Sequence, residues 1–535
     1  MEFNPLCNPY KVKRNVSYGL RGMVAVSQPF AAEAGFEMLK SGGNAIDAAI
    51  AAAAALTVCE PTSNGIGGDA FAIVWWKGKL YGLNSSGKSP KGISIELLKG
   101  LNIRDIPEFG WETVNVPGVP AAWGALSEKF GKLEFKKLIE PAVNYAENGF
   151  PVTPVLAYYW NKEYNHLKNS LRGEKYNHWF ETFAPEGRAP KSGEVFRYKN
   201  LGKTLRLIGE SKGASFYKGE IADKIDFFSR KTSGYIRKSD LESFNPEWVE
   251  PISVNYKGYD VFEIPPNGQG ITALMALNIL KGFDLKHCSE VEKIHRQIEA
   301  VKLAFMDSLK YVTDINKMNI TIDELLSEER AENKRSMISE TAICPEKTKH
   351  NQGGTVYLAA ADEEGNMVSY IQSNYMGFGS GLVVPDTDIS LHSRGRNFSF
   401  DSNHINALEP CKRPYHTIIP GFLMKDKKPI GPFGIMGGFM QPQAHVQVLM
   451  NCIDYNMNPQ AALDAPRWIW MKEKEVRLEN GFDTYYAEVL EEKGHNVKYD
   501  CDSLLFGRGQ IIWRNEDGVY IGGTDSRTEG TIYSW

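Results

Sequence analysis

The segment from residue 45 to residue 58 places the strongest constraint on what this chain can fold into. It is rich in alanine, and its apolar residues cover most of the circumference of a helix. Asn44, directly before it, is a favourable N-cap residue. The segment contains Asp47 and is too short to span a bilayer. We therefore predict a helix that is packed closely on both sides within the protein.

The remaining chain alternates between helical and strand patterns, and its character changes near residue 355. Before that point we predict helices at 29–40, within 119–150 and 155–235, at 271–280 and at 291–312, and strands at 70–76, 80–84, 252–254 and 259–264. After it we predict strands at 417–424, 429–436, 476–478, 497–499, 509–513 and 519–522, and helices at 441–452, 459–465 and 485–493. Helices that bracket strands from both halves predict an α+β fold with two stacked, mainly antiparallel sheets between helix layers.

A predicted hairpin lies at the point where the character changes. Its strands cover 356–361 and 367–373, and the turn between them contains Gly365. Thr355 opens the first strand directly behind Gly353 and Gly354, and the charged residues 320–350 before them predict a helix followed by a mobile tail. A threonine in this position is usually structural. If the Gly354–Thr355 bond were cut, however, the new α-amino group, with a pKa of roughly 7.7–8, could activate the threonine hydroxyl.

Several short motifs occur in a fixed order along the chain. They lie at residues 41–49, 64–69, 116–120, 355 with its hairpin, 412–414, 436–438 and 522–526. Each is weak alone, but together they resemble the gamma-glutamyltranspeptidase family of N-terminal-nucleophile hydrolases over nearly the whole chain. This resemblance implies a four-layer αββα architecture and a self-catalysed cut between Gly354 and Thr355. Residues 1–354 would form a large subunit and residues 355–535 a small one, with one shared core and no cofactor.

The same resemblance assigns the catalytic groups. Thr355 would attack an amide carbonyl to form an acyl-enzyme, which water or an amine would then release. Ser373 falls where the family has a hydroxyl residue beside the nucleophile, although it could simply lie on the polar face of a strand. Gly437 and Gly438 resemble the pair whose N–H groups bind the oxyanion, and such donors contribute roughly 3–4 kcal/mol each. A plain turn is the alternative interpretation of these two glycines.

The substrate-binding positions depart from the family pattern. Ser86 stands where the family has an arginine for the α-carboxylate of a γ-glutamyl group, and Lys88 lies two residues further on. By alignment the predicted substrate contacts are Lys88, Asn374, Tyr375, Arg394, Asn397, His416 and Thr417. The changes remove the counter-charges of a zwitterion and add a cation, Arg394. They favour an acidic or amide-bearing substrate that lacks an α-amino group.

Composition excludes several other classes of function. The net charge of −4, with both signs mixed along the chain, gives no sign of nucleic-acid or membrane binding. The first residues show no signal-peptide pattern, so we expect a cytoplasmic protein. The seven cysteines are scattered, which predicts free thiols, and neither they nor His392, His404 and His416 have the spacing of a metal site.

Three functions remain open at this point. The leading one is a self-processing threonine hydrolase or transferase that acts on a γ-glutamyl or related small-molecule amide. The second is an acylase or amidohydrolase of the same family without γ-glutamyl specificity. The third is an uncut, catalytically silent binding protein. The sequence also leaves a homodimer open.

Overall fold

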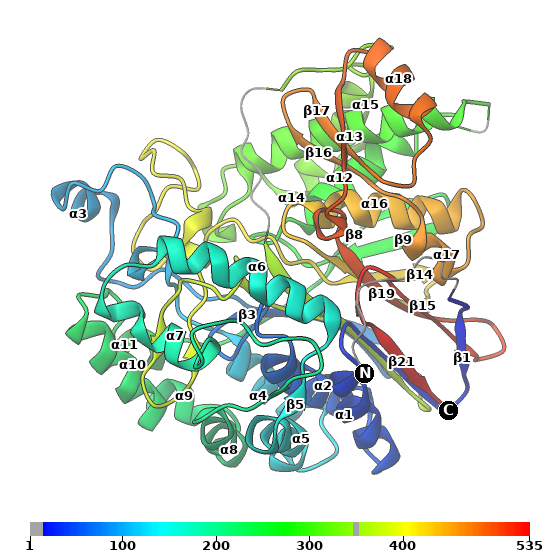
Figure 1. Ribbon diagram of the computed structural model, residues 1–535. Helices are drawn as coiled ribbons and strands as arrows, with labels where there is room; N and C mark the ends of the chain where they lie inside the picture. Colours follow the sequence, from blue (N-terminus) through cyan, green and yellow to red (C-terminus); the bar gives the residue numbers. More distant parts are fainter. Residues whose placement is uncertain (1–13, 286, 346–352) are drawn as a thin grey trace.

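Two seven-stranded antiparallel sheets form the centre of the computed structural model, which describes residues 14–285, 287–345 and 353–535 (Figure 1). In strand order, the first sheet contains β1 (Ser17–Gly19), β20 (Tyr520–Thr524), β19 (Arg508–Arg514), β15 (Lys428–Met436), β14 (Gly421–Lys425), β9 (Tyr259–Glu263) and β8 (Ile252–Tyr256). The second contains β21 (Thr531–Ser534), β2 (Gly22–Val26), β10 (Gly354–Asp362), β11 (Met367–Tyr375), β3 (Asp69–Trp76), β4 (Lys79–Ser85) and β7 (Glu247–Val249).

Helices cover the outer faces of both sheets. The second sheet packs against α1 (Pro29–Lys40), α2 (Ala45–Cys59) and α4 (Val119–Phe130), mainly through α2, and α5 (Phe135–Asn148) packs against α2. The first packs against α12 (Gly270–Leu280) and α16 (Met440–Ile453), and α13 (Glu290–Tyr311) packs against these two helices. Between the sheets, β10 contacts β15 and β19. The predicted αββα architecture is therefore confirmed (Figure 1).

The alanine-rich segment forms α2 and is buried along its whole length. Asn44 caps the helix as predicted, because its Oδ1 accepts hydrogen bonds of 3.0 Å from the N–H groups of Ile46 and Asp47. The Asp47 carboxylate in turn accepts from the Asn44 N–H at 3.0 Å and completes a capping box. Small side chains let α2 lie close to α1 and α5 on one side and to the sheet on the other.

Strands from both sides of residue 355 are interleaved in each sheet. The hairpin β10–β11 lies between β2 and β3, which come from the first hundred residues. In the first sheet, β9 pairs with β14 from the other half. Separating residues 1–354 from residues 355–535 would break up both sheets. This arrangement supports the prediction that two subunits of one precursor would stay associated, and the division itself stays a prediction.

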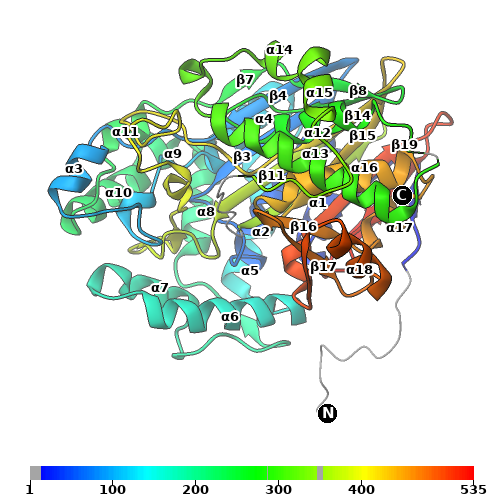
Figure 2. The same ribbon diagram turned by 90° about the horizontal axis from the view of Figure 1, so that it is seen from above.

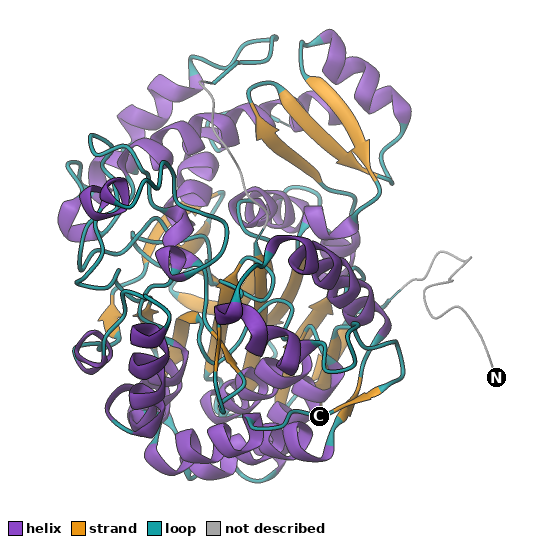
Figure 3. Ribbon diagram, turned by 60° about the vertical axis from the view of Figure 1, so that its left-hand side comes forward, coloured by secondary structure: helices purple, strands orange, loops and turns teal. Residues whose placement is uncertain are grey.

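The helical region at 155–235 lies at the periphery, as predicted (Figure 2). It contains α6 (Pro154–Ser170), α7 (Asn177–Phe183), α8 (Leu201–Ser211), α9 (Ala214–Lys218) and α10 (Glu220–Lys231). A three-stranded sheet beside α18 (Thr484–Glu492) lies apart from the two large ones and contains β16 (Trp468–Lys472), β17 (Glu475–Glu479) and β18 (Asn496–Asp500) (Figure 3). Shorter elements are α3 (Ile95–Gly100), β5 (Phe150–Pro151), β6 (Val195–Phe196), α11 (Lys238–Glu242), β12 (Val383–Val384), β13 (Ile389–Ser390) and α17 (Pro459–Asp464).

Three details differ from the expectations. The strand predicted at 417–424 begins only at Gly421, so the residues before it form a loop. The single helix expected after residue 320 is divided into α14 (Ile322–Leu325) and α15 (Glu328–Arg335), because the capping hydroxyls of Thr321 and Ser327 each start a new helix. The predicted mobile tail falls largely on residues 346–352, which lie outside the described residues, as do the first residues and Cys7.

The motif at 522–526 has a packing role. Asp525 is fully buried, and its carboxylate lies 2.6 Å from Arg467 and 3.0 Å from Arg527. It also accepts a hydrogen bond of 3.0 Å from the N–H of Gly509 in β19. The six cysteines within the described residues are free thiols, as expected. None of the described helices is long and apolar enough to cross a membrane.

Candidate active site

Thr355 lies at a β-bulge where β10 and β11 separate. The register passes from Gly354 opposite Tyr375 to Val356 opposite Gln372, so Ser373 and Asn374 together oppose Thr355. The bulge turns the Ser373 hydroxyl toward Thr355, and the Thr355 Oγ1 donates a hydrogen bond of 3.2 Å to the Ser373 Oγ. Both residues are buried.

Ser373 connects the predicted nucleophile to the bond that would be cut. Its hydroxyl donates a hydrogen bond of 2.6 Å to the carbonyl oxygen of Gly354 and accepts one of 2.8 Å from the N–H of Tyr375. A donor on the Gly354 oxygen polarises this carbonyl, and the hydroxyl oxygen faces the Thr355 proton. If Thr355 is the nucleophile, Ser373 is placed both to direct its proton and to stabilise charge on the Gly354 oxygen.

The glycine turn predicted as the oxyanion site lies against the same stretch of chain. It follows β15, and Gly437 and Gly438 have φ values of 146° and 61°, which favour glycine. A Cβ atom added to Gly353 would lie 3.4 Å from the Cα of Gly438. The Gln269 side chain fixes the turn, because its Nε2 donates to the carbonyl oxygens of Gly438 and Thr417 at 2.8 and 2.6 Å. The oxyanion role stays a prediction that this position supports.

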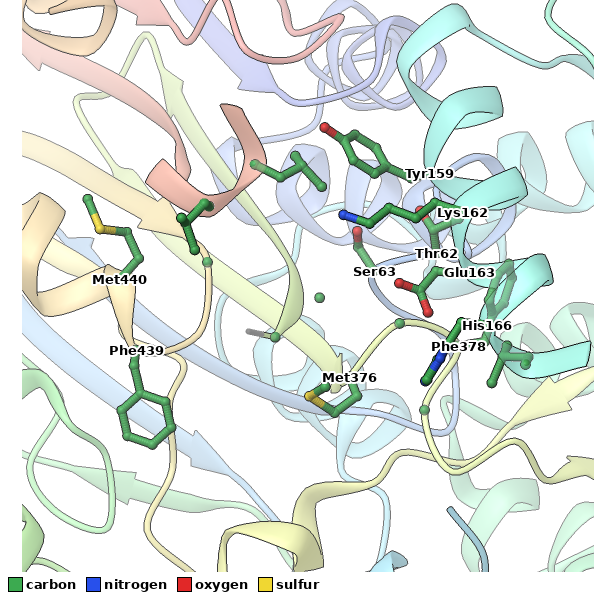
Figure 4. Close-up of a pocket in the computed structure, with 18 of the residues that line it drawn as sticks. Thr62, Ser63, Tyr159, Lys162, Glu163, His166, Met376, Phe378, Phe439 and Met440 are labelled. Atoms are coloured by element: carbon green, nitrogen blue, oxygen red, sulfur yellow. The ribbon is translucent and has the colours of Figure 1, made fainter. Parts of the chain in front are cut away.

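A cavity of about 210 Å³ opens beside these groups. Its lining includes Gly353, Gly354 and Gly437, together with the loop at 376–379 and the N-terminal end of β19. Helix α6 forms one side and contributes Tyr159, Lys162, Glu163 and His166, while Met376, Phe439 and Met440 lie across from it (Figure 4). The cavity therefore combines an apolar side with a charged one, next to the predicted nucleophile.

The α6 residues were missed by the sequence reasoning. Tyr159, Lys162, Glu163 and His166 share one face of a helix, but they carry no motif and lie in a region that was expected to be peripheral. Lys162 is paired with Asp502 at 2.6 Å. Burial raises the pKa of the Glu163 carboxyl, which lies against the backbone of Gly377. The available signal was the spacing of polar residues along one helix face.

Two of the predicted substrate contacts surround a buried aspartate instead. The Asp69 carboxylate lies 2.9 Å from the His416 Nε2 and 3.5 Å from the Arg394 Nε, and all three side chains are fully buried. His392 lies 3.4 Å from the same carboxylate. Burial alone would raise the pKa of Asp69, but the charges of His392 and Arg394 and the hydrogen bond from His416 hold it to about 2. Asp69 is also the cross-strand partner of Ser373, so this cluster supports the strand that carries Ser373.

The other predicted contacts are also separate from the cavity. Asn374 is buried against Gly65 and Gly68, and the ring of Tyr375, at a φ of 74°, lies 4.6 Å from the Arg394 guanidinium. The Thr417 hydroxyl accepts a hydrogen bond of 2.7 Å from Arg394, the Asn397 amide donates to Tyr415 O at 3.0 Å, and Lys88 is exposed. None of the seven side chains lines the cavity described above. Direct contact with substrate stays a prediction for them.

The buried His416 predicts a pH dependence of stability. Burial and the charge of Arg394 lower the pKa of His416 to about 3, against an ordinary value of 6.5. The unfolded chain therefore binds a proton between these values that the folded chain excludes, and stability is lost as the pH falls below 6.5. One such group contributes about 1 kcal/mol per pH unit. In uncut Thr355→Ala protein, His416→Gln should flatten the decline of the thermal midpoint between pH 6.5 and pH 4.5.

A histidine outside the core provides the control for this measurement. His178 is partly exposed beside Glu181, and His178→Gln should leave the decline as steep as in the parent protein. Parallel midpoint curves for the parent and His416→Gln would contradict the assignment.

One cluster in the described part of the chain has the composition of a metal site. His295, Glu299 and His495 are buried, with donor atoms within 4.8 Å of one another. The Lys302 ammonium group, however, lies 2.7 Å from the Glu299 carboxylate, and the His295 Nδ1 lies within hydrogen-bonding distance of the His495 Nε2 at 2.8 Å. The lysine thus already supplies the cation that the carboxylate requires. The expectation of no metal stays a prediction.

Comparison with known proteins decides the family. The family model described as gamma-glutamyltranspeptidase matches residues 31–535. The chain belongs to this family. A glutathione hydrolase-like proenzyme of Bacillus subtilis, YwrD, is 36% identical over 527 residues, which cover 96% of this chain and 98% of the relative. An oxamate amidohydrolase proenzyme of Klebsiella pneumoniae is 30% identical over 522 residues, with 95% and 97% covered.

A solved structure agrees with this placement. A cephalosporin acylase from Bacillus halodurans is 55% identical, with a TM-score of 0.97, and the match covers 100% of this chain and 99% of that one. The resemblance inferred from the motifs is confirmed, and so is the fold of the N-terminal-nucleophile hydrolases. By their names, the relatives described here include hydrolases of several different amides, so family membership alone leaves the substrate open.

Proposed function

We propose that this chain is a proenzyme that cuts itself before Thr355 and then hydrolyses a small-molecule amide through a threonyl acyl-enzyme. The observation that carries the proposal is the hydrogen-bond chain from Thr355 through Ser373 to the carbonyl oxygen of Gly354. It joins a hydroxyl, a possible proton acceptor and the carbonyl of the Gly354–Thr355 bond beside a cavity, as the proposed chemistry requires. The names of two relatives, both called proenzymes, support the self-processing step.

Self-processing and amide hydrolysis would use the same groups. In the precursor, the Thr355 hydroxyl attacks the Gly354 carbonyl, the peptide nitrogen leaves as the new α-amino group, and an ester joins Gly354 to the Thr355 oxygen. Water hydrolyses this ester, which ends the covalent link between the two subunits and leaves Thr355 as a free N-terminal residue. The α-amino group then takes the hydroxyl proton when Thr355 attacks the substrate amide, and it returns a proton to the leaving amine.

We further propose that the substrate is an acyl amide without an α-amino group, as in the acylases and amidohydrolases of the family. Ser86, at the position of the family arginine, is buried and donates its hydroxyl to Asn84 at 2.8 Å. Asn397 donates to a backbone carbonyl. Neither residue provides a counter-charge for a γ-glutamyl group. The names of the oxamate amidohydrolase and the cephalosporin acylase agree with this specificity, whereas the name of the glutathione hydrolase-like relative favours γ-glutamyl amides.

The experiment has two stages. Purified wild-type protein is first analysed by intact mass and N-terminal sequencing, and we expect a fragment that begins at Thr355. Turnover of γ-glutamyl 4-nitroanilide is then compared with that of the glutaryl and 4-carbamoylbutanoyl 4-nitroanilides, which lack the amino group. Faster turnover of the γ-glutamyl compound would contradict the proposed specificity. A chain that stays uncut and inactive would instead favour the silent binding protein.

A further inference from the structure

Arg508 is a cation at the wall of the cavity that no motif identified. It opens β19 and lies opposite Met436, the residue directly before the Gly437–Gly438 turn. A Cβ atom added to Gly437 would lie 3.1 Å from the Cα of Gly507, so the chain that leads into Arg508 touches the turn. The Arg508 side chain lines the cavity and is only 9% exposed. It is thus placed beside the predicted oxyanion site and largely out of bulk water.

The ion pair that Arg508 forms with Glu60 is weak. Its Nη1 lies 3.7 Å from the Glu60 carboxylate, beyond hydrogen-bonding distance, and within the described residues no hydrogen bond accompanies this ion pair. Glu60 does not line the cavity, and it accepts a hydrogen bond of 2.6 Å from Ser27 instead. Burial raises the pKa of the Glu60 carboxyl, and the charge of Arg508 offsets only part of this shift. The guanidinium also lies 5.9 Å from the ring of Tyr159.

Two other cations near the site are placed differently. Lys162 lies 2.6 Å from Asp502. Arg394, although its Nε and Nη2 make no hydrogen bond with any described residue, is fully buried beside Asp69 and does not line the cavity. Arg508 therefore has N–H groups to spare at the cavity wall. A guanidinium presents five donors in a planar fork that matches a carboxylate, and such charge-assisted pairs are strong where water is scarce.

We propose that Arg508 binds a free carboxylate at the far end of the acyl group. The preferred substrates are then monoamides of short dicarboxylic acids, in which one carboxyl group forms the scissile amide and the other stays ionised. This inference rests on the proposed function, because it assumes that the acyl group enters the cavity beside Thr355. The acidic substrate expected from Arg394 is retained, but a different cation recognises it.

Two matched amides test the proposal by turnover. Glutaryl 4-nitroanilide carries the free carboxylate, and 4-carbamoylbutanoyl 4-nitroanilide replaces it by a neutral amide of the same shape. We expect wild-type protein to prefer the glutaryl compound by about 10- to 100-fold in kcat/KM, as for a hydrogen bond to a charged group. Arg508→Gln should remove this preference mainly through KM, and Arg508→Lys should keep part of it because the charge remains without the fork.

Arg514 provides the matched control. It lies on the same strand outside the cavity lining, and Arg514→Gln should leave the preference unchanged. A preference that survives Arg508→Gln, or equal loss of both activities in that variant, would overturn the inference. Chain cutting should remain complete in every Arg508 variant, and its loss in them would mean that the arginine only maintains the fold.

A binding measurement separates this inference from the proposed function. Glutarate has two carboxylates, and one of them can bind Arg508. It should therefore raise the thermal midpoint of wild-type and Arg514→Gln protein, but not that of Arg508→Gln. Absence of this shift in the wild type would contradict the Arg508 inference whatever the turnover. A shift without hydrolysis of either amide would support the carboxylate site and count against the proposed function alone.

Discussion

Replacement of Thr355 by alanine should leave a single chain of 59.9 kDa, where wild-type protein gives fragments of about 40 and 20 kDa in proportion to their lengths. Alanine removes the hydroxyl that is proposed to attack the Gly354 carbonyl and leaves the Ser373 hydroxyl, which donates to the oxygen of that carbonyl. Amide hydrolysis should be lost as well, since neither the nucleophile nor the free α-amino group forms. Denaturing electrophoresis with intact mass, before and after long incubation, measures both states.

Two further variants make this result specific. Thr355→Ser keeps a hydroxyl and should still cut, which shows that the chemistry depends on the oxygen atom. Thr204 is another buried threonine with one hydrogen bond, to Thr387 O at 2.8 Å, and Thr204→Ala should cut as the wild type does. Two fragments from Thr355→Ala would place the nucleophile elsewhere, and an intact wild-type chain would remove the basis for a free amine.

The parts of the fold that the sequence predicted well are those with strong local signals. The bounds of α1 agree with the predicted helix, and α2 differs by one residue, because proline and asparagine mark their first turns. The hairpin at β10–β11 was predictable from two apolar runs around a glycine turn. In each case the residues that decide the structure are neighbours in the sequence.

The missed strands lack such a signal. The five residues of β2 are all buried and apolar, so they show no alternation, and a run this short is not distinguishable from a helix segment by periodicity. Strand β21 pairs with β2 at the edge of the sheet, and its pairing depends on contacts across almost the whole chain. Only the assembled sheet gives either segment its conformation.

The candidate site likewise contains residues with a local sequence signal and residues that only the tertiary structure brings to it. Thr355, Ser373 and the Gly437–Gly438 turn were found through motifs, and the structure brings them together. The charged lining of the cavity comes instead from α6 and β19, which meet only in the tertiary structure. Arg394 shows the limit of alignment. A position can match the family while its side chain pairs with a buried carboxylate, since sequence does not reveal what surrounds a charge.

Replacement of Ser373 by alanine should slow the cut by about 100-fold or more, because one change removes two functions. The Thr355 hydroxyl loses its hydrogen-bond acceptor, and the Gly354 carbonyl loses the donor that polarises it. The N–H of Tyr375 also loses its partner, so the bulge itself is less well fixed. The fraction of uncut chain, followed by electrophoresis after a pulse of synthesis, gives the rate. Ser373→Thr should retain part of it, since threonine keeps the hydroxyl.

Ser369 offers a control on the same face of the same strand. It lies four residues before Ser373, is equally buried, and its hydroxyl lies 2.8 Å from that of Tyr357. Ser369→Ala therefore removes a buried hydrogen bond between two neighbouring strands of the second sheet without touching Thr355 or Gly354, and it should lower stability by about 1 kcal/mol while the cut stays fast. Equal slowing in the two alanine variants would show that any loss of packing at β11 delays the cut, and Ser373 would then have no chemical role. Slowing confined to Ser373→Ala would assign the proton path to this hydroxyl.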